Sequence, residues 1–248
     1  HDLITYHDTG CLVMKTDASQ KMFRFYKTME EIECPYTEVP INKIDSYIPG
    51  ANTSNFSPAK TLEGETFGEP TASSVSGAVF FPRCGYVNDP KLSTQNVQRA
   101  AEVHGAQFKL NTAVAKILQV KGRVSGVELS DGSTIEALLV INFAGPHSSN
   151  INEKAGVADT RKMSTRTLRQ EVAHVPAPEG FTESNGIVSS DGDAHVYPRP
   201  ERRNNLLIRS EDPEYDEKEW GNDPDTFDHN FSTHWKTKVM VSNGSQVA

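Results

Sequence analysis

The stretch Leu138-Leu139-Val140-Ile141-Asn142-Phe143-Ala144-Gly145-Pro146 decides the predicted fold of this chain. Its first six residues form an almost continuous apolar run, which is typical of a strand buried on both faces of an α/β sheet. The run stops at Ala144-Gly145-Pro146, and small residues at the carboxyl end of such a strand let a ligand approach the backbone closely. A helix is predicted over 148–155, capped by Ser148 or Ser149, and its free N–H groups could face an anion such as a dinucleotide pyrophosphate. On these residues alone, a purely structural strand-to-helix turn is an equally good interpretation.

The residues before this run predict an antiparallel meander. A short strand at 107–110 is followed by strands at 113–120, at 124–129 and from Ile135 onward. Lys121-Gly122 supplies a two-residue turn between the first two strands of the meander.

A strand and a helix precede the meander. Residues 77–82 read as a strand, and Asp89-Pro90 opens a helix over 90–104 with an N-cap carboxylate and a proline at the first helical position. Gly105 supplies the C-terminal stop. The helix is predicted to be amphipathic, with an apolar face of Val97, Ala100, Ala101 and His104.

The two ends of the chain are less regular. Leu12-Val13-Met14 predicts a short strand, 17–32 a helix, and 49–76 a long surface connection rich in Gly, Pro, Ser, Thr and Asn. After Gly156, the stretches 166–175, 187–190, 194–199 and 205–209 predict an antiparallel sheet. The acidic segment 212–228 reads as a solvated connector.

Composition excludes several classes of function. The chain of 248 residues carries 25 Lys+Arg against 33 Asp+Glu, a net charge of −8, which argues against a nucleic-acid partner. No apolar run approaches the roughly 20 residues that cross a bilayer, and His1-Asp2 does not open a secretory signal, so we expect no membrane insertion.

The chemistry-bearing residues give few direct signals. Cys11, Cys34 and Cys84 are widely spaced and odd in number, which indicates neither a disulfide framework nor a zinc site and fits an intracellular, reducing compartment. The histidines lack HxH or HExxH spacing, so no metal site is predicted. No nucleophile motif of the GxSxG type is present.

The order of motifs from Gly77 to Gly156 resembles the middle of the FAD-dependent oxidoreductases of the D-amino-acid oxidase, glycine oxidase and sarcosine oxidase type. The stretches that carry it are "GAVFFPRCGYVNDPKLSTQNVQRAAEVHGAQFKLNTAVAKI" and "VSGVELSDGSTIEALLVINFAGPHS". A weaker likeness extends from Leu12 to about Trp220. The joint order is far more specific than any single motif.

The resemblance implies a cofactor and its contacts. In that family, the stretch matching Thr112-Ala113-Val114 brings backbone groups to the adenine of FAD, so Val114 is a candidate cofactor contact. The stretch matching 143–148 lies beside the pyrophosphate and ribityl chain, which makes Ala144, Gly145 and Pro146 candidates as well. This sequence has Phe143 where the family usually has a small residue, and His147 where it usually has an aromatic one.

The resemblance also implies a substrate site. In the amino-acid oxidases, an antiparallel sheet over the flavin contributes Tyr and Arg side chains that hold the substrate carboxylate. By that resemblance Tyr197 and Arg199 are candidates, since a guanidinium grips a carboxylate bidentately and a phenol adds one donor. Because side chains alternate between the two faces of a strand, Tyr197 and Arg199 lie on the same face. The alternative is that Arg199 is simply exposed to solvent and has no role in binding.

Two family features are absent from this sequence. Members begin with a GxGxxG turn for the ADP phosphates and end with a glycine-rich segment around the flavin, and neither pattern is present. The simplest explanation is a fragment that lacks both ends of the cofactor domain. We then expect that 138–143 lacks neighbouring strands and that this chain alone binds FAD weakly or not at all.

The sequence therefore predicts a mixed α/β (α+β) fold, with a partial FAD-binding Rossmann-like domain and an antiparallel-sheet substrate domain. The predicted divisions are an N-terminal substrate-side segment (1–76), the partial FAD domain (77–157) and the substrate sheet with its acidic C-terminal segment (158–248). The implied function is oxidation of the C–N bond of an amino acid or secondary amine by hydride transfer to FAD. The alternative is a non-catalytic relative that serves as a binding or assembly module.

Overall fold

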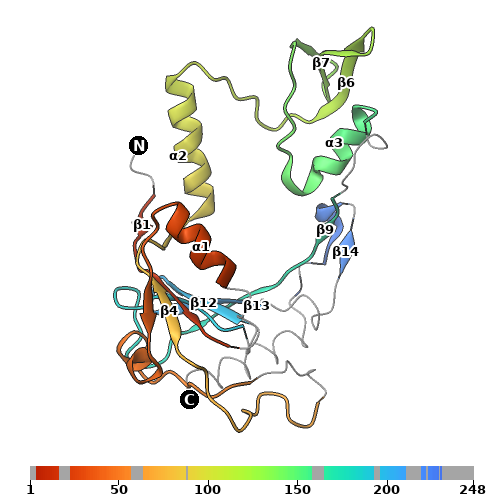
Figure 1. Ribbon diagram of the computed structural model, residues 1–248. Coiled ribbons are helices and arrows are strands. Elements are labelled where there is room, and N and C mark those ends of the chain that lie inside the picture. The colour runs from red at the N-terminus through yellow and green to blue at the C-terminus, as the bar shows by residue number, and fades with distance from the viewer. Residues whose placement is uncertain are drawn as a thin grey trace. The chain divides into compact units, whose positions relative to one another are not determined.

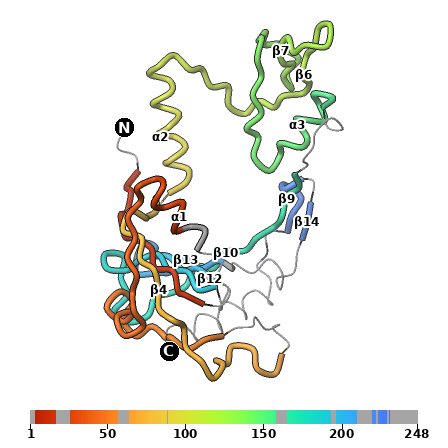
Figure 2. Tube along the Cα trace, viewed as in Figure 1, coloured from red at the N-terminus to blue at the C-terminus, as the bar shows by residue number. Residues whose placement is uncertain are grey.

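The computed structural model describes residues 4–16, 23–56, 64–87, 89–157, 165–192, 196–210, 219–221, 223–228 and 230. Figures 1 and 2 trace these ranges in colour. The chain divides into two compact units, which are described separately below. Unit 1 comprises residues 1–100, 171–217 and 230–248, and unit 2 comprises residues 101–170 and 218–229. This grouping does not test the functional division at residues 76 and 157, which stays a prediction.

The helices follow local signals in the sequence. They are α1 (Phe23–Glu31), α2 (Pro90–Val103), α3 (Ser148–Lys154) and the short 3-10 helices η2 (Ile41–Ser46), η3 (Gly145–His147) and η5 (Pro224–Thr226). The predicted start of α2 is confirmed, because Asp89 Oδ1 accepts a hydrogen bond from the Leu92 N–H (2.9 Å). Gly105 follows this helix with φ +87°. In the part of the chain that the structure describes, every helix is too short or too polar to cross a membrane.

The apolar face predicted for α2 is not buried. No residue of this helix is buried, and Val97 is 68% exposed. An amphipathic pattern predicts a helix with one apolar side, but it does not say which surface covers that side.

The main sheet of unit 1 has four strands in the order β11-β2-β4-β3. Its strands are β2 (Cys11–Met14), β3 (Thr37–Val39), β4 (Ala78–Phe81) and β11 (Val188–Ser190). β4 pairs antiparallel with β2 and β3, as in Leu12↔Phe80 and Thr37↔Phe80. β11 pairs parallel with β2 through Val188↔Cys11.

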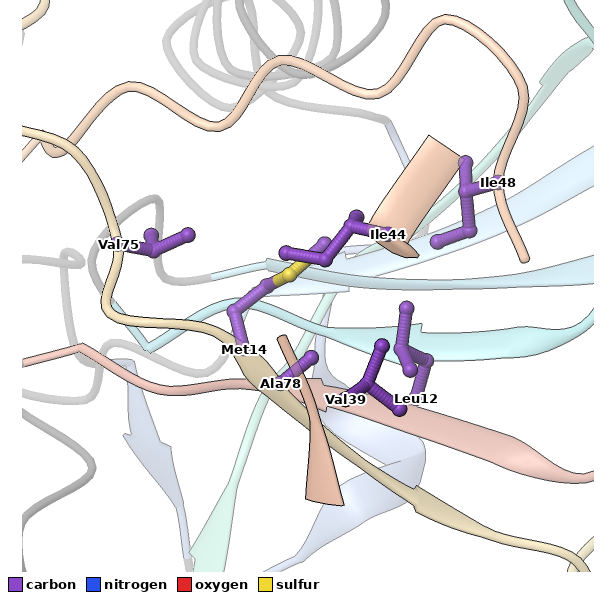
Figure 3. Close-up of a cluster of buried hydrophobic side chains, with 7 residues drawn as sticks. All are labelled: Leu12, Met14, Val39, Ile44, Ile48, Val75 and Ala78. Atoms are coloured by element: carbon purple, nitrogen blue, oxygen red, sulfur yellow. The ribbon is translucent and has the colours of Figure 1, made fainter. Parts of the chain in front are cut away.

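The core of unit 1 lies on one face of this sheet, where β2 and β4 turn alternate residues inward (Figure 3). Leu12 is fully buried, and η2 contributes Ile44, which is fully buried too. The cluster consists of Leu12, Met14, Val39, Ile44, Ile48, Val75 and Ala78. A buried leucine or isoleucine of this size contributes roughly 1.5–3 kcal/mol through the hydrophobic effect.

A second sheet of unit 1 has the order β10-β13-β12. Its antiparallel strands are β10 (Val172–Pro176), β12 (Val196–Glu201) and β13 (Asn205–Ser210). One face packs Ala173, Val196, Leu206 and Ile208 into a small core. Two prolines in β12 are tolerated because β12 is an edge strand. A two-stranded sheet of β1 (Tyr6–His7) and β5 (Tyr86–Val87) completes the unit.

Unit 2 is built on the predicted meander of β6 (Val114–Val120), β7 (Arg123–Leu129) and β8 (Thr134–Glu136). The predicted turn at Lys121-Gly122 is confirmed, since both residues have positive φ (50° and 77°), as the tightest hairpin connection requires. β9 (Thr167–Leu168) pairs with β14 (Trp220–Gly221) in the same unit.

Two strands predicted in unit 2 are absent. Residues 107–110 and 138–143 belong to no strand. The prediction that 138–143 is buried on both faces is wrong for this chain, because Leu138 is 98% exposed and Phe143 is 88% exposed. An apolar run becomes a strand only when a neighbour accepts its backbone hydrogen bonds, and the described residues supply none for this run.

Two further predictions are corrected. The strand expected over 166–175 is split into β9 and β10, which pair in different units. The stretch 187–190 was expected to join the same antiparallel sheet as β12 and β13, but β11 pairs with β2 instead. Periodicity predicts that these stretches are strands, while the choice of partner depends on distant residues.

Candidate cofactor and substrate sites

The turn at 144–146 is a tight, exposed backbone feature of unit 2. Gly145 has φ +55°, a left-handed conformation that strongly favours glycine, and Pro146 stands in the first turn of η3. Nothing lies within 4 Å of the position that a Cβ on Gly145 would take. The backbone at Gly145 is therefore open to close approach.

Asn142 holds this turn against α3. Its Oδ1 accepts a hydrogen bond from the Ala144 N–H (3.0 Å). Its Nδ2 donates to the Ser148 carbonyl (2.9 Å) and to Asn152 Oδ1 (3.1 Å). The polar residue inside an otherwise apolar run thus fixes the turn that follows it. The helix itself begins at Ser148 after His147, without the side-chain cap predicted from Ser148 or Ser149.

Val114 lies at the other end of α3. Lys154 Nζ donates to the Val114 carbonyl (2.7 Å), and Gln119 Nε2 donates to the Ala155 carbonyl (2.7 Å). With seven residues, α3 is about 10 Å long, so Val114 and the turn at 144–146 flank a helix of that length.

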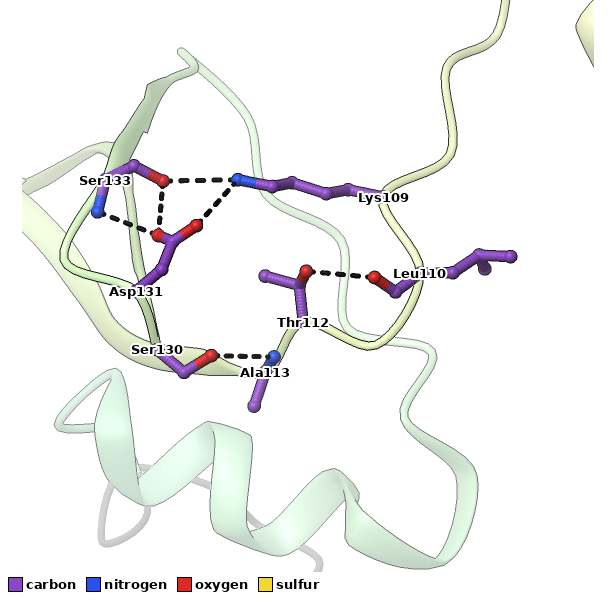
Figure 4. A network of polar contacts seen from close by, with 7 residues as sticks. All are labelled: Lys109, Leu110, Thr112, Ala113, Ser130, Asp131 and Ser133. Atoms are coloured by element: carbon purple, nitrogen blue, oxygen red, sulfur yellow. Dashed lines mark hydrogen bonds and ion pairs between the residues drawn. The ribbon is translucent and has the colours of Figure 1, made fainter.

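A polar network fixes the loop that leads to Val114 (Figure 4). Lys109 Nζ lies 3.2 Å from both Asp131 Oδ2 and Ser133 Oγ. Asp131 Oδ1 accepts from the Ser133 hydroxyl (2.5 Å) and the Ser133 N–H (2.9 Å). These Ser133 hydrogen bonds, followed by Lys109, lower the pKa of Asp131 from 3.8 to about 2. Residues 107–110 are thus tied to a turn by a side chain rather than by a strand ladder.

His147 belongs to a group that the sequence spacing did not reveal. His147, Asp223 and Asp225 each offer one ligand atom, and these atoms lie within 4.8 Å of one another. His147 Nε2 is 3.7 Å from Asp225 Oδ1. The two aspartates are exposed, and Asp223 caps η5 by accepting from the Asp225 N–H (3.0 Å). Exposed acidic groups commonly gather without an ion, so this geometry alone does not indicate a metal site.

The two candidate substrate residues lie on one face of β12, as alternation predicts. Arg199 forms an ion pair with Glu201 (2.9 Å), and its guanidinium stands 4.5 Å from the centre of the Tyr86 ring. The Tyr197 hydroxyl accepts from Arg209 Nη1 (3.2 Å). Both candidates therefore have protein partners, and a substrate carboxylate would compete with Glu201 for Arg199.

Tyr86 joins the β1–β5 pair to this polar face. The His7 and Tyr86 rings stack with centroids 4.8 Å apart and planes 7° from parallel. Burial raises the pKa of Tyr86, while the nearby Arg199 lowers it. The buried Tyr86 hydroxyl and His7 Nε2 have no hydrogen-bond partner among the described residues. Sequence reasoning missed His7, Tyr86 and Glu201, because nothing local to these residues indicates that β1, β5 and β12 meet.

Two substitutions separate the hydrogen bond that Asn142 Oδ1 accepts from those that its Nδ2 donates. Asn142→Ala removes all three hydrogen bonds, and at about 1 kcal/mol for each bond we expect the Ala144 amide to exchange at least about tenfold faster. Asn142→Asp keeps an acceptor for the Ala144 N–H and loses only the two Nδ2 donors, so the Ala144 amide should stay protected. Amide hydrogen exchange measures both. Equal exchange at Ala144 in the two variants would contradict this assignment.

Acid should release the Lys109–Asp131 contact. Because the folded-state pKa of Asp131 is lowered, the ionised form stabilises the fold above pH 4, and this contribution is lost as the pH falls through about 2. NMR titration of the Asp131 carboxyl should give a midpoint near 2. Ser133→Ala keeps the backbone N–H bond but removes the hydroxyl hydrogen bond, which is the largest single cause, so it should raise that midpoint more than Lys109→Met does. The reverse order would show that the lysine charge dominates.

Comparison with solved structures shows the fold. L-proline dehydrogenase from P. horikoshii aligns with a TM-score of 0.72 at 15% identity, covering 98% of this chain and 57% of that one. Glycine oxidase from Geobacillus kaustophilus aligns at 0.65 and 18% identity, covering 98% and 55%. Iminodiacetate oxidase from Chelativorans sp. BNC1 aligns at 0.61 and 16% identity, covering 97% and 57%.

This chain therefore spans little more than half the length of these structures. A search of curated protein sequences found no match. The sequence model of the family described as "FAD dependent oxidoreductase" matches residues 2–235. That match confirms the resemblance carried by residues 77–156, and the chain belongs to the FAD-dependent oxidoreductase family.

Proposed function

We propose that this chain is the central part of an FAD-dependent oxidoreductase that oxidises the C–N bond of an amino acid or secondary amine. The observation that carries the proposal is the family match over residues 2–235. The names of the similar structures support the substrate class, since proline, glycine and iminodiacetate each combine an amine with a carboxylate. When bound, FAD would accept a hydride from the carbon that bears the neutral amine.

Within unit 2, we propose that Val114, Ala144, Gly145 and Pro146 contact the cofactor. The open backbone at Gly145 and the stapling of the turn by Asn142 support this assignment. The extent of α3 between Val114 and the turn suits a ligand that runs along it. These residues offer one side of a site, because the chain has no GxGxxG turn to hold the ADP phosphates.

Within unit 1, we propose that Arg199 binds the substrate carboxylate and that Tyr197 adds a hydrogen bond. The chain's own residues orient the arginine, since Glu201 and the Tyr86 ring hold its guanidinium from two directions. If the substrate carboxylate displaced the Glu201 carboxylate from Arg199, the guanidinium would still have one anionic partner. No side chain needs to act as a strong acid or base in this scheme, so positioning is the main contribution of this sheet.

Two preparations test the proposal. The 248-residue chain, purified alone, should carry well under one flavin per chain by visible absorbance. The protein extended to the full reading frame of its gene should bind FAD, and anaerobic addition of proline, glycine or iminodiacetate should bleach the flavin absorbance. A stoichiometric flavin in the short chain would contradict its central-part status. A full-length protein that keeps its flavin oxidised with every amine would instead be a binding or assembly module.

A matched pair of arginine variants tests the substrate site in the full-length protein. Arg199→Lys loses bidentate binding, and a hydrogen bond to a charged group contributes about 1.5–3 kcal/mol, so KM for a carboxylate substrate should rise roughly 10- to 100-fold. Arg203→Lys, in the exposed turn between β12 and β13, should leave KM unchanged. Equal KM values for the two variants would remove Arg199 from the site.

A further inference from the structure

Three cysteines that are far apart in the sequence lie at one end of the main sheet of unit 1. Cys11 is the first residue of β2, Cys84 lies three residues after the end of β4, and Cys34 lies three residues before the start of β3. In the antiparallel register, these three positions belong to the same sheet end. None of the three cysteines is in a disulfide, and all three are half-buried.

Cys34 and Cys84 flank the same pair of strands. Thr37 of β3 faces Phe80 of β4, and the Tyr36 and Phe81 rings remain in contact one residue further along (6.4 Å between centroids). The two chains therefore leave the sheet side by side, with Cys34 on one and Cys84 on the other.

Both cysteine backbones are fixed where they leave the sheet. The Cys34 N–H donates to the Met29 carbonyl (2.8 Å) at the end of α1, and the Cys84 carbonyl accepts from the Gly10 N–H (2.8 Å). Fixed backbones limit the entropy that a cross-link between them must overcome. Any such link must still meet the Cα separation of roughly 4.4–6.8 Å that a disulfide needs.

The electrostatics of Cys84 point to Cys34 as its neighbour. Burial raises the pKa of the Cys84 thiol, and the charges of Cys34 and Asp8 raise it further. The effect of Cys34 on this pKa agrees with the position of the two cysteines at adjoining strand ends. Cys11 is not among the groups that shift Cys84, although its strand is adjacent.

We propose that Cys34 and Cys84 are a redox-active thiol pair that forms a reversible disulfide when the protein meets a peroxide. One thiolate attacks a peroxide oxygen, so that an S–O bond forms, the O–O bond breaks and one water leaves after protonation. The second sulfur then attacks the sulfenic sulfur, the S–S bond forms, and the hydroxyl departs as a second water. The two sulfurs lose two electrons and the peroxide gains them. Because burial disfavours its thiolate, Cys84 is the expected second, resolving thiol.

The disulfide would connect the sheet end to the residues that position Tyr86. Gly85 and β5 follow Cys84 directly, and Tyr86 of β5 contacts His7 and Arg199. Oxidation would therefore restrain the polar face of β12 from a distance. The thiol chemistry itself needs neither flavin nor amine, so its test is independent of the proposed function.

The experiment uses the purified chain in its reduced state. Thiol titration should count three thiols before treatment and one after a small excess of hydrogen peroxide. Non-reducing peptide mapping by mass spectrometry should identify a Cys34–Cys84 peptide pair within one chain, and dithiothreitol should restore all three thiols. Cys11→Ser is the matched control and should form the same pair. Cys34→Ser and Cys84→Ser should each abolish it.

Three results would overturn the proposal: three thiols remain after treatment, the linked peptide contains Cys11, or the cysteines are oxidised singly without a link. Circular dichroism of each reduced variant checks folding. If a variant does not fold, peptide mapping of the unsubstituted chain still decides between these outcomes.

Discussion

An apolar strand must be paired on its edges and covered on its faces, and residues 138–143 have no partner strand among the residues that the structure describes. Leu138 and Phe143 are almost fully exposed, and the run belongs to no strand of the described residues. Unpaired backbone N–H and C=O groups of this kind can form hydrogen bonds with another strand. The turn at 144–146 that follows the run is held by Asn142 and α3, and by a hydrogen bond from Thr167 Oγ1 to the Pro146 carbonyl (3.4 Å).

The sequence predicts the elements that rest on local signals. The cap at Asp89, the turn at Lys121-Gly122 and the short strand at Leu12-Val13-Met14 each depend on a few neighbouring residues, and each is confirmed in the structure. Pairing partners are different, because β11 joins β2 from the far end of the chain, and periodicity contains no information on that choice. The prediction for the apolar run at 138–143 is wrong for a related reason. Its apolar composition is typical of a strand buried on both faces, but its burial depends on whether other segments pack against it.

The candidate sites divide in the same way. The turn at 144–146 could be found from the sequence, since small residues after an apolar run are a local pattern. Asn142 was counted as part of that run, yet its amide organises the turn and α3. The substrate candidates Tyr197 and Arg199 share a face as alternation predicts, but their partners Tyr86, Glu201 and Arg209 come from three strands. The ion pair between Arg199 and Glu201 could therefore be identified only from the structure. The meeting of Cys34 and Cys84 likewise follows from sheet register and not from spacing.

The central claim is that residues 138–143 pair with no strand of the described residues and, as the proposed central part of a longer protein, gain a partner strand there. Amide hydrogen exchange of this segment, followed by NMR or mass spectrometry in the short chain and in the full-length protein, tests it most directly. The account predicts exchange close to the unprotected rate in the short chain and strong protection in the full-length protein, because pairing would bury these amides. Strong protection in the short chain, or none in the full-length protein, would contradict it.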